Sequence, residues 1–420
     1  MSNRIDTENI HPALSHDESE DAHFKAEEQE EEAEETTRLS ATEATYNDYL
    51  LQKITEMFNK EEKEAFMIAS DQKRPVTIRT NTLFDKRQPI LQKLANRGVN
   101  IEGIEWNNCS AVVYNSDVPI GATPEYLAGL YILQSPSSVL PVLALDPQEN
   151  ETVVDMCAAP GGKTTHIAAL MNNTGTIYAN DVSEERAISL AANIQRMGVS
   201  NTIVSVMGGR GLPFTNVNRV LLDAPCSGTG VLSKDPAAKR NKDEKVIKQL
   251  QYKQMALILK AFDMLDPRTP ETSILVYSTC SILVEENEYI VDHLLKKRKN
   301  ARVIDAGLPI GKEGYKSYRG WTFHPSLKNT RRLYPHVHNT DGFFVAKIRK
   351  IGYSPEEIEE KKAEKIKSRD INKKAKLEKE KPAEKKSTEP IVRKKKQKDS
   401  QKKAFAERKK KRAEKAQAKE

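Results

Sequence analysis

Residues 146–350 show short apolar runs that alternate with longer segments of helical periodicity. Runs such as Thr152–Asp155 are largely apolar at consecutive positions, as in strands that are buried on both faces of a parallel sheet. Segments such as Lys245–Leu265 are amphipathic at helical spacing. This order predicts an α/β domain with a doubly wound, mostly parallel sheet. The predicted strands cover 152–155, 175–181, 202–206, 219–223 and 273–278, and the predicted helices cover 163–171, 184–197 and 245–265.

Residues 46–145 mix the two patterns over a shorter span. The segment 49–58 has the i, i+3, i+4 spacing of an amphipathic helix, and 75–81 alternates and is rich in β-branched residues, which favours a strand. A second helix, 90–97, is predicted to end at Gly98, and a second strand to cover 111–114. The pattern indicates a small α+β module, and its place ahead of the larger domain suggests substrate handling.

Charge separates the ends of the chain from its middle. Residues 1–45 contain 14 acidic and 3 basic residues, whereas residues 351–420 contain 26 basic and 14 acidic ones. We expect both ends to be mostly disordered, because they hold too little apolar surface to offset the ordering entropy. The basic clusters at 393–396 and 408–412 fit a solvated extension, or a nuclear or nucleolar address with affinity for RNA.

Several classes of protein are disfavoured. No run approaches the roughly 18–20 consecutive apolar residues of a membrane span, and the first residues lack the apolar core of a secretory signal. The four cysteines, Cys109, Cys157, Cys226 and Cys280, are too few for a disulfide scaffold, and none forms a CxxC pair. We therefore expect no membrane association, no metal site and a reducing compartment such as the cytosol or nucleus.

A segment of small residues, Cys157–Lys163, follows the first strand of the larger domain. Such residues let a ligand approach the N–H groups that begin the next helix. The spacing of a phosphate-binding P-loop fails, because Cys157 stands where its first glycine belongs. Asp181 ends the second strand about 20 residues later, where an acidic residue typically holds the ribose of a nucleoside cofactor. Capping of the next helix is the alternative role.

Two cysteines follow two further strands, in Asp223–Gly230 and in Ser278–Ser281. Because the carboxyl ends of parallel strands meet at one edge of a sheet, Cys226 and Cys280 can converge on one cleft. A lone buried cysteine is usually a small core residue. A pair in this setting favours a thiolate nucleophile over a disulfide.

These motifs occur together with the segments 74–82, 119–126, 320–326 and 341–346. In this combination residues 46–350 resemble the Sun-type RNA cytosine-5 methyltransferases, in particular the nucleolar subfamily that modifies large-subunit rRNA. The resemblance implies a Rossmann-like class I methyltransferase domain at 146–350, an RNA-handling module at 46–145, and S-adenosylmethionine as cofactor. The arm 1–45 and the tail 351–420 lie outside it.

The resemblance also implies roles for individual residues. Cys280 would attack carbon 6 of cytosine, which activates the otherwise poorly nucleophilic carbon 5, and Cys226 would assist release of the methylated RNA. Asp223 would hydrogen-bond the base near ring nitrogen 3, and Lys163 would act electrostatically. The target base must be unstacked or single-stranded. The cofactor would be held by Cys157, Ala158, Ala159, Pro160, Gly161, Gly162, Lys163, Asp181 and Asp223.

One position departs from the family pattern. Gly208, in Met207–Arg210, stands where the family commonly has an acidic residue that contacts the adenine side of the cofactor. Either backbone contacts substitute for that residue, or the affinity for the cofactor is lower.

A group of basic and aromatic residues suits contacts with RNA phosphates and bases. Trp321 and Tyr334 fit an ordinary core equally well. The group consists of Arg79, Lys316, Tyr318, Arg319, Trp321, His324, Arg331, Arg332 and Tyr334.

The sequence thus predicts an S-adenosylmethionine-dependent rRNA cytosine-5 methyltransferase of ribosome biogenesis. It would work on rRNA in pre-ribosomal particles in the nucleus and nucleolus, with protein partners that the sequence does not identify. The alternative is a pre-ribosome RNA-binding assembly factor in which methylation is secondary. A DNA cytosine methyltransferase is disfavoured, because it would carry its nucleophile in the PC motif.

Overall fold

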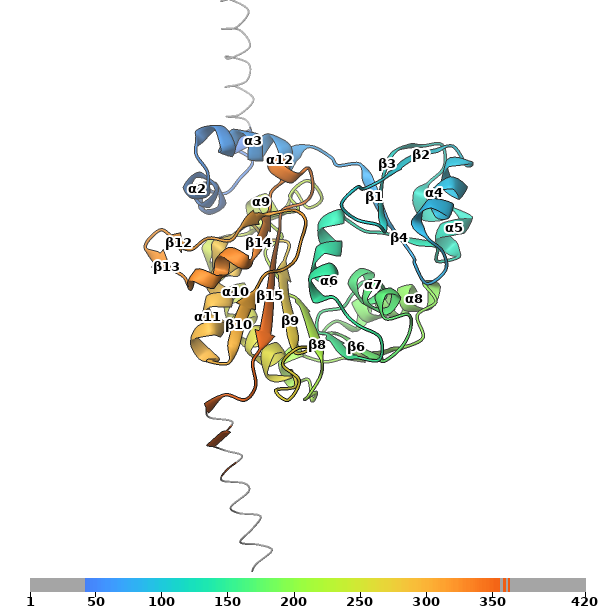
Figure 1. The fold of residues 1–420 in the computed structure, drawn as a ribbon. Coiled ribbons are helices and arrows are strands. Elements are labelled where there is room, and N and C mark those ends of the chain that lie inside the picture. Colours follow the sequence, from blue (N-terminus) through green and yellow to red (C-terminus); the bar gives the residue numbers. More distant parts are fainter. Residues whose placement is uncertain (1–41, 356–357, 360–361, 363–420) are drawn as a thin grey trace, which may run out of the picture. The chain divides into compact units, whose positions relative to one another are not determined.

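The computed structural model describes residues 42–355, 358–359 and 362. Nearly all of the predicted arm (1–45) and tail (351–420), including both basic clusters, therefore lies outside the described residues. The described chain up to Pro355 belongs to one compact unit. Its elements are drawn in Figure 1.

Within the described residues the larger sheet has nine strands, of which five are parallel. The parallel strands run in the order β9-β8-β5-β6-β7, and the predicted α/β sheet is confirmed. They are β5 (Thr152–Asp155), β6 (Thr176–Asp181), β7 (Thr202–Val206), β8 (Arg219–Asp223) and β9 (Ile274–Thr279).

Antiparallel strands extend the sheet beyond β9. The strand β15 (Phe343–Lys350) pairs with β9, and β14 (Arg331–Leu333) and β10 (Ala301–Ile304) pair with successive parts of β15. The short β11 (Lys312–Glu313) completes this edge. The sequence did not predict these strands, because charged residues interrupt their apolar pattern.

Helices cover both faces of this sheet (Figure 1), because successive residues of each strand point to opposite sides. Val153 packs with α6 (Leu140–Leu145) and α7 (Gly162–Leu170), whereas Val154 packs with α10 (Glu244–Asp263) and α11 (Glu288–Lys297). The helix α8 (Glu184–Arg196) packs on the side of Ala179. Each fully buried side chain of this kind contributes about 1.5–3 kcal/mol. The doubly wound arrangement is therefore as predicted.

The smaller sheet is antiparallel, with the strand order β2-β3-β1-β4. Its strands are β1 (Val76–Thr80), β2 (Val99–Gly103), β3 (Ser110–Ser116) and β4 (Tyr131–Leu133). Ile78 and Ala111 pack with Ile90 and Leu94 of α4 (Arg87–Ala95). The chain turns after α4 at Gly98, whose φ of +81° favours glycine. The short α5 (Pro124–Leu127) follows β3.

The first two described helices of this unit, α2 (Asp48–Met57) and α3 (Lys60–Asp71), pack away from the smaller sheet. Leu50 and Phe66 share a core with Ile282 and Tyr334, beyond the strands of the large sheet. The helix α12 (Pro335–His338) lies beside α3 (Figure 1). The predicted amphipathic helix is confirmed, but its partners are remote in sequence. The remaining elements are α9 (Ala238–Asn241), β12 (Ser317–Tyr318) and β13 (Trp321–Thr322).

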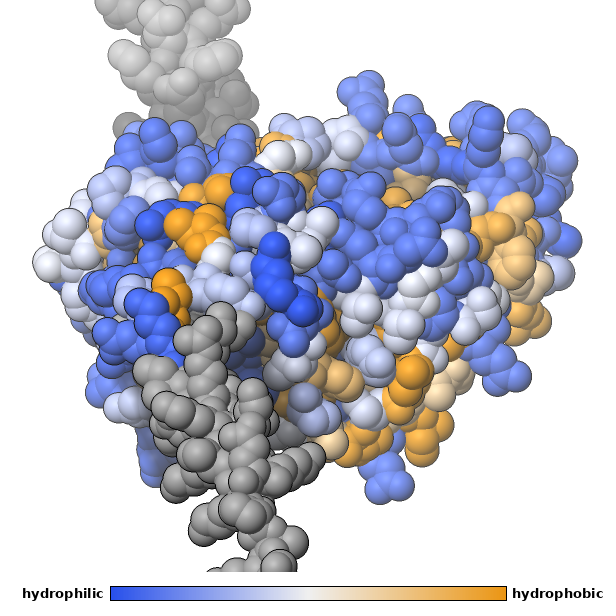
Figure 2. Space-filling view, turned by 60° about the horizontal axis from the view of Figure 1, so that its bottom comes forward, coloured by the Kyte–Doolittle hydropathy of each residue, from blue (hydrophilic) through white to orange (hydrophobic). Residues whose placement is uncertain are grey.

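The lower side of Figure 1, turned forward in Figure 2, is mostly hydrophilic with small apolar patches. Small apolar patches of this kind are normal on a protein surface. No helix among the described residues is long and apolar enough to cross a bilayer.

Candidate active site

A cleft of about 300 Å³ lies at the carboxyl ends of the parallel strands. It brings together most of the predicted site: Cys157, Ala158, Ala159, Pro160, Gly162, Lys163, Asp223 and Cys280. It also contains residues that sequence reasoning did not single out as site residues, namely Leu133, Gln134, Ser135, Ser138, Val231, Lys234, Asp341 and Phe343. The predicted residues Gly161, Asp181 and Cys226 do not line the cleft, but each is hydrogen-bonded to a residue that does.

The two cysteines meet at the ends of β8 and β9. Cys226 Sγ and Cys280 Sγ are 3.3 Å apart, a hydrogen-bond distance, and both thiols are free. The hydrogen bond with Cys280, together with burial and the charge of Glu286, raises the pKa of Cys226 well above its ordinary value. Cys226 therefore keeps its proton and can donate it in a hydrogen bond to the sulfur of Cys280.

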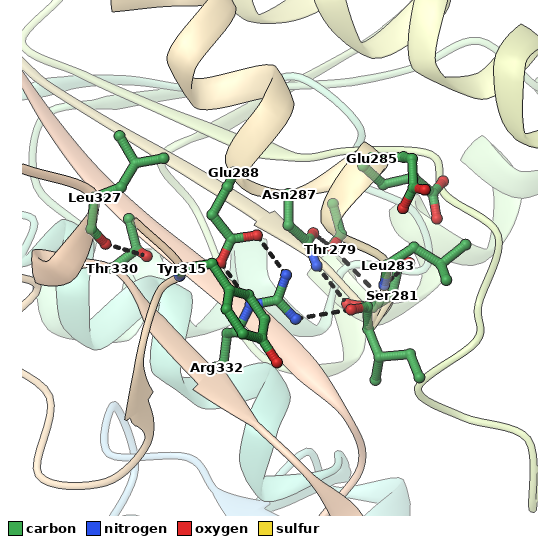
Figure 3. Close-up of polar contacts among 12 residues, drawn as sticks. Thr279, Ser281, Leu283, Glu285, Asn287, Glu288, Tyr315, Leu327, Thr330 and Arg332 are labelled. Atoms are coloured by element: carbon green, nitrogen blue, oxygen red, sulfur yellow. Dashed lines mark hydrogen bonds and ion pairs between the residues drawn. The ribbon is translucent and has the colours of Figure 1, made fainter. Parts of the chain in front are cut away.

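The loop that carries Cys280 is held from several sides by buried polar groups (Figure 3). Asn287 Nδ2 donates to the carbonyl oxygen of Ser281 at 2.9 Å, and Thr279 Oγ1 donates to Asn287 Oδ1 at 2.5 Å. Arg332 Nη1 donates to the carbonyl oxygen of Ile282 at 2.7 Å. Asn287 and Arg332, from separate parts of the chain, thus restrict the backbone that follows Cys280, and Thr279, directly before it, is tied to Asn287.

Arg332 is itself fixed by a buried ion pair with Glu288 (Figure 3). Burial alone would lower the pKa of Arg332, but the charge of Glu288 outweighs it and raises that pKa. The pair links β14 to the start of α11. It therefore belongs to the scaffold of the Cys280 loop.

Two glycines allow a close crossing of the chain beneath Cys280. The N–H of Gly230 donates to the carbonyl oxygen of Cys280, and the N–H of Gly342 donates to that of Gly230, both at 2.8 Å. A Cβ atom at Gly230 would lie 2.1 Å from the oxygen of Gly342. Only glycine fits this crossing, which connects the motif 223–230 to the motif 341–346.

Lys163 and Asp223 form an ion pair inside the cleft. Lys163 Nζ is 2.7 Å from Asp223 Oδ2, and Ser278 Oγ donates to Asp223 Oδ1 at 2.7 Å. Burial by itself would lower the pKa of Lys163. The charge of Asp223 and the hydrogen bond to it, with smaller contributions from Asp155 and Cys280, outweigh the effect of burial and raise that pKa. The ammonium group is therefore held against the carboxylate of Asp223, in the cleft that Cys280 also lines.

The small-residue loop after β5 turns into α7 at Gly161, whose φ is +101°. No side chain caps the first turn of this helix, so its N–H groups face the cleft as donors for an anionic ligand group. A Cβ atom at Gly162 would approach Gln134 Nε2 to 3.4 Å. The loop is thus a cradle that larger side chains would fill, and it fits the carboxylate end of S-adenosylmethionine.

Asp181 is buried and braces the same loop. Its Oδ2 accepts from the N–H of Ala159 at 3.2 Å, and its Oδ1 accepts from the N–H of Ser183, at the start of α8, at 3.0 Å. Arg186 lies 3.5 Å away. The side chain that caps α8 is that of Ser183, not Asp181, and the ribose role of Asp181 stays a prediction.

The carboxyl of Asp155, at the end of β5, is buried beneath the loop. Thr164 Oγ1 donates to its Oδ2 at 2.7 Å, and within the described residues its Oδ1 has no hydrogen-bond partner. Burial raises the pKa of Asp155 to about 7. Sequence reasoning missed this group, because an aspartate that ends an apolar strand carries no signal of its own burial.

Gly208 lies beside open space. A Cβ atom there would have no atom within 4 Å, so the chain could accommodate the acidic side chain that the family commonly has. The neighbouring loop is held by Asn180, whose Nδ2 donates to the carbonyl oxygens of Met156 and Met207. Asn180 therefore links the loops after β5 and β7.

The expected RNA contacts are wrong for four residues, because these are buried: Arg79, Tyr318, Arg332 and Tyr334. Arg79 instead donates to Gln134 Oε1 and to Thr165 Oγ1, both at 2.7 Å. Trp321 is 38% exposed. The core alternative therefore holds for Tyr334, and only the exposed members of the group remain candidates. No cluster of metal-binding side chains occurs in the part of the chain that the structure describes.

A doubly wound α/β sheet with a small-residue loop after its first parallel strand is typical of Rossmann-like domains that bind a nucleoside-containing cofactor. Residues 142–349 match the family described as 16S rRNA methyltransferase RsmB/F. A Pyrococcus horikoshii structure titled as a methyltransferase homolog protein is 34% identical with a TM-score of 0.66, over 76% of this chain and 98% of that one. The chain belongs to the Sun-type RNA cytosine-5 methyltransferase family, of which RsmB/F proteins are members.

Two curated relatives carry large-subunit names. A mouse 28S rRNA (cytosine-C(5))-methyltransferase is 53% identical over 317 residues, which cover 75% of this chain and 40% of the relative. The Schizosaccharomyces pombe 25S rRNA (cytosine-C(5))-methyltransferase nop2 is 52% identical over 310 residues, which cover 73% and 51%. The matched part thus spans about half of these relatives or less.

Proposed function

We propose that the protein is an S-adenosylmethionine-dependent RNA cytosine-5 methyltransferase that acts on large-subunit rRNA. The observation that carries the proposal is the pair of thiols 3.3 Å apart at the ends of β8 and β9, beside the ion pair of Lys163 and Asp223. The names of the relatives support the rRNA substrate. Work within pre-ribosomal particles of the nucleolus is part of the same proposal.

Cys280 is the proposed nucleophile. Its sulfur lies 3.3 Å from that of Cys226, whose pKa is raised, and the ammonium of Lys163 lines the same cleft. The thiolate forms a bond to carbon 6 of cytosine, and the electron pair of the 5,6 double bond moves to carbon 5. This carbon then becomes nucleophilic, which an aromatic cytosine is not.

Asp223 is proposed to orient the base through ring nitrogen 3, since Lys163 and Ser278 fix both of its oxygens. After carbon 5 has gained its methyl group, it loses its proton to a base. The double bond re-forms and the bond between carbon 6 and Cys280 breaks, which returns the thiolate. Cys226 lies within reach to assist this release.

S-adenosylmethionine, when bound, supplies the methyl group from its sulfonium. The cradle Cys157–Lys163 would hold its carboxylate end and Asp181 its ribose. These assignments are supported by the uncapped start of α7 and by the small residues around it. Gly208 leaves the adenine side without the usual acidic group.

The test is incubation of precursor rRNA with labelled S-adenosylmethionine and either wild type or Cys280→Ala. We expect label in RNA cytosine with wild type and none with the variant. Tight RNA binding by wild type without any methyl transfer would overturn the proposal and favour the assembly-factor alternative.

A further inference from the structure

The cleft contains a group of charges that the proposed chemistry does not use. Lys234 lies in the loop after Cys226 and lines the same cleft as Cys280. Its Nζ is 2.6 Å from Asp341 Oδ2, and its side chain is 55% exposed. The role of this lysine at the rim therefore needs an explanation of its own.

Asp341 does not depend on Lys234 for its partners. The carboxylate is buried, and Ser135 Oγ also donates to its Oδ2 at 2.6 Å. Arg74 Nη1 lies 3.9 Å from its Oδ1, and this oxygen has no hydrogen bond within the described residues. The lysine end of this ion pair is exposed and the carboxylate end is buried, and exposure of the ammonium to water reduces what the pair contributes to stability. Lys234 is thus a poor stabiliser of Asp341, which already has Arg74 as a positively charged neighbour.

The charges of the group do not cancel. Arg74 and Lys234 bring two positive charges to the single negative charge of Asp341, so the group has a formal charge of +1. The backbone of Lys234 is fixed, since its N–H donates to the carbonyl oxygen of Val231 at 2.9 Å. One proton of the ammonium faces Asp341, and the other two remain for a ligand. The result is a positioned cation at the edge of the cleft.

We propose that Lys234, held by Asp341, binds a backbone phosphate of the RNA next to the target nucleotide. This inference rests on the proposed function and adds a binding site to it. A nucleotide whose base reaches Cys280 brings its phosphates to the rim, and the rim offers this uncompensated charge. Leu133, 44% exposed in the same lining, provides an apolar surface beside it for a neighbouring base.

The test compares Lys234→Gln and Lys234→Arg with wild type in binding a short fluorescent oligocytidylate at salt concentrations from about 50 to 200 mM. Loss of one phosphate contact reduces the slope of log K against log salt by about 0.7 on single strands. We expect this reduction in Lys234→Gln and the wild-type slope in Lys234→Arg. Lys248→Gln is the matched control, because Lys248 is an exposed, ion-paired lysine of α10 outside the cleft.

Two further measurements separate this site from other roles. The melting temperature and the affinity for S-adenosylmethionine should be equal in wild type and Lys234→Gln. The phosphate site is overturned if Lys234→Gln keeps the wild-type slope of log K against log salt. It is also overturned if the variant loses affinity for S-adenosylmethionine instead of losing salt dependence. Methyl transfer by wild type would in that case leave the proposed function intact, whereas a wild type that binds no RNA overturns both.

Discussion

Arg79 of β1 donates a hydrogen bond to Thr165 of α7, so the smaller sheet is fastened to the helix that follows the small-residue loop after β5. The guanidinium is fully buried and also bonds Gln134, which lines the cleft.

Replacement of Arg79 by Gln should destabilise the fold. The change leaves Thr165 and Gln134 without their buried partner, and the expected loss is about 2–3 kcal/mol of the free energy of unfolding. Chemical denaturation measures it. Arg97→Gln, which removes a part-exposed pair with Glu125, is the control and should cost under about 1 kcal/mol. Equal losses in the two variants would contradict the role of Arg79.

Alanine variants of the two cysteines should differ in whether a covalent RNA–protein adduct accumulates. Cys226→Ala should accumulate a covalent RNA–protein adduct in the presence of the methyl donor, since the nucleophile acts but release is impaired. Cys280→Ala should form none. Denaturing electrophoresis with labelled RNA detects the adduct. An adduct in the double variant would refute Cys280 as the nucleophile.

Asp155 should make stability depend on pH. Its pKa is about 7 in the folded protein against 3.8 for the free side chain, so the folded state binds the proton more tightly. The stability that the protonated carboxyl contributes is complete below about 3.8 and is lost as the pH rises to about 7.

Asp155→Asn removes this titration. Relative to the variant, wild type should lose up to about 4 kcal/mol between pH 4 and 7, as a shift of about three pKa units requires. Urea unfolding at a series of pH values tests it. If the free energy of unfolding of wild type and of Asp155→Asn changes with pH in the same way, Asp155 does not titrate in this range.

Gly230→Ala should disrupt the site. The new Cβ would meet the backbone of Gly342 at 2.1 Å and displace the carbonyl of Cys280. We expect a loss of about 1–3 kcal/mol in stability and a loss of methyl transfer. Gly211→Ala is the control, because a Cβ there meets nothing within 4 Å. Full activity in Gly230→Ala would contradict the close crossing.

Gly208→Asp should strengthen cofactor binding. Open space beside Gly208 admits the carboxylate, and one hydrogen bond to a charged group is worth about 1.5 kcal/mol, or roughly tenfold in affinity. Titration calorimetry with S-adenosylmethionine measures the change, with Gly211→Asp as the control. Unchanged affinity would indicate that the loop after β7 does not contact the cofactor.

The parallel strands, their helices and the order of the motifs were predictable from local patterns. Strands such as Thr152–Asp155 are covered by helices on both faces of the sheet, so consecutive residues must be apolar. This pattern can be recognised in the sequence alone. Because the carboxyl ends of parallel strands meet at one edge of a sheet, the sequence alone also predicts that Cys226 and Cys280 lie at the same edge.

Only the tertiary structure decided that the two thiols lie 3.3 Å apart and that the pKa of Cys226 is raised, because both depend on contacts between distant segments. It also decided that Arg79 and Arg332 are buried and that α2 and α3 pack beyond the large sheet. Arginine is usually exposed, and nothing local distinguishes a buried one. Asp341 joins Arg74, Ser135 and Lys234 across more than a hundred residues of chain, and contacts of that range exist only once the chain has folded.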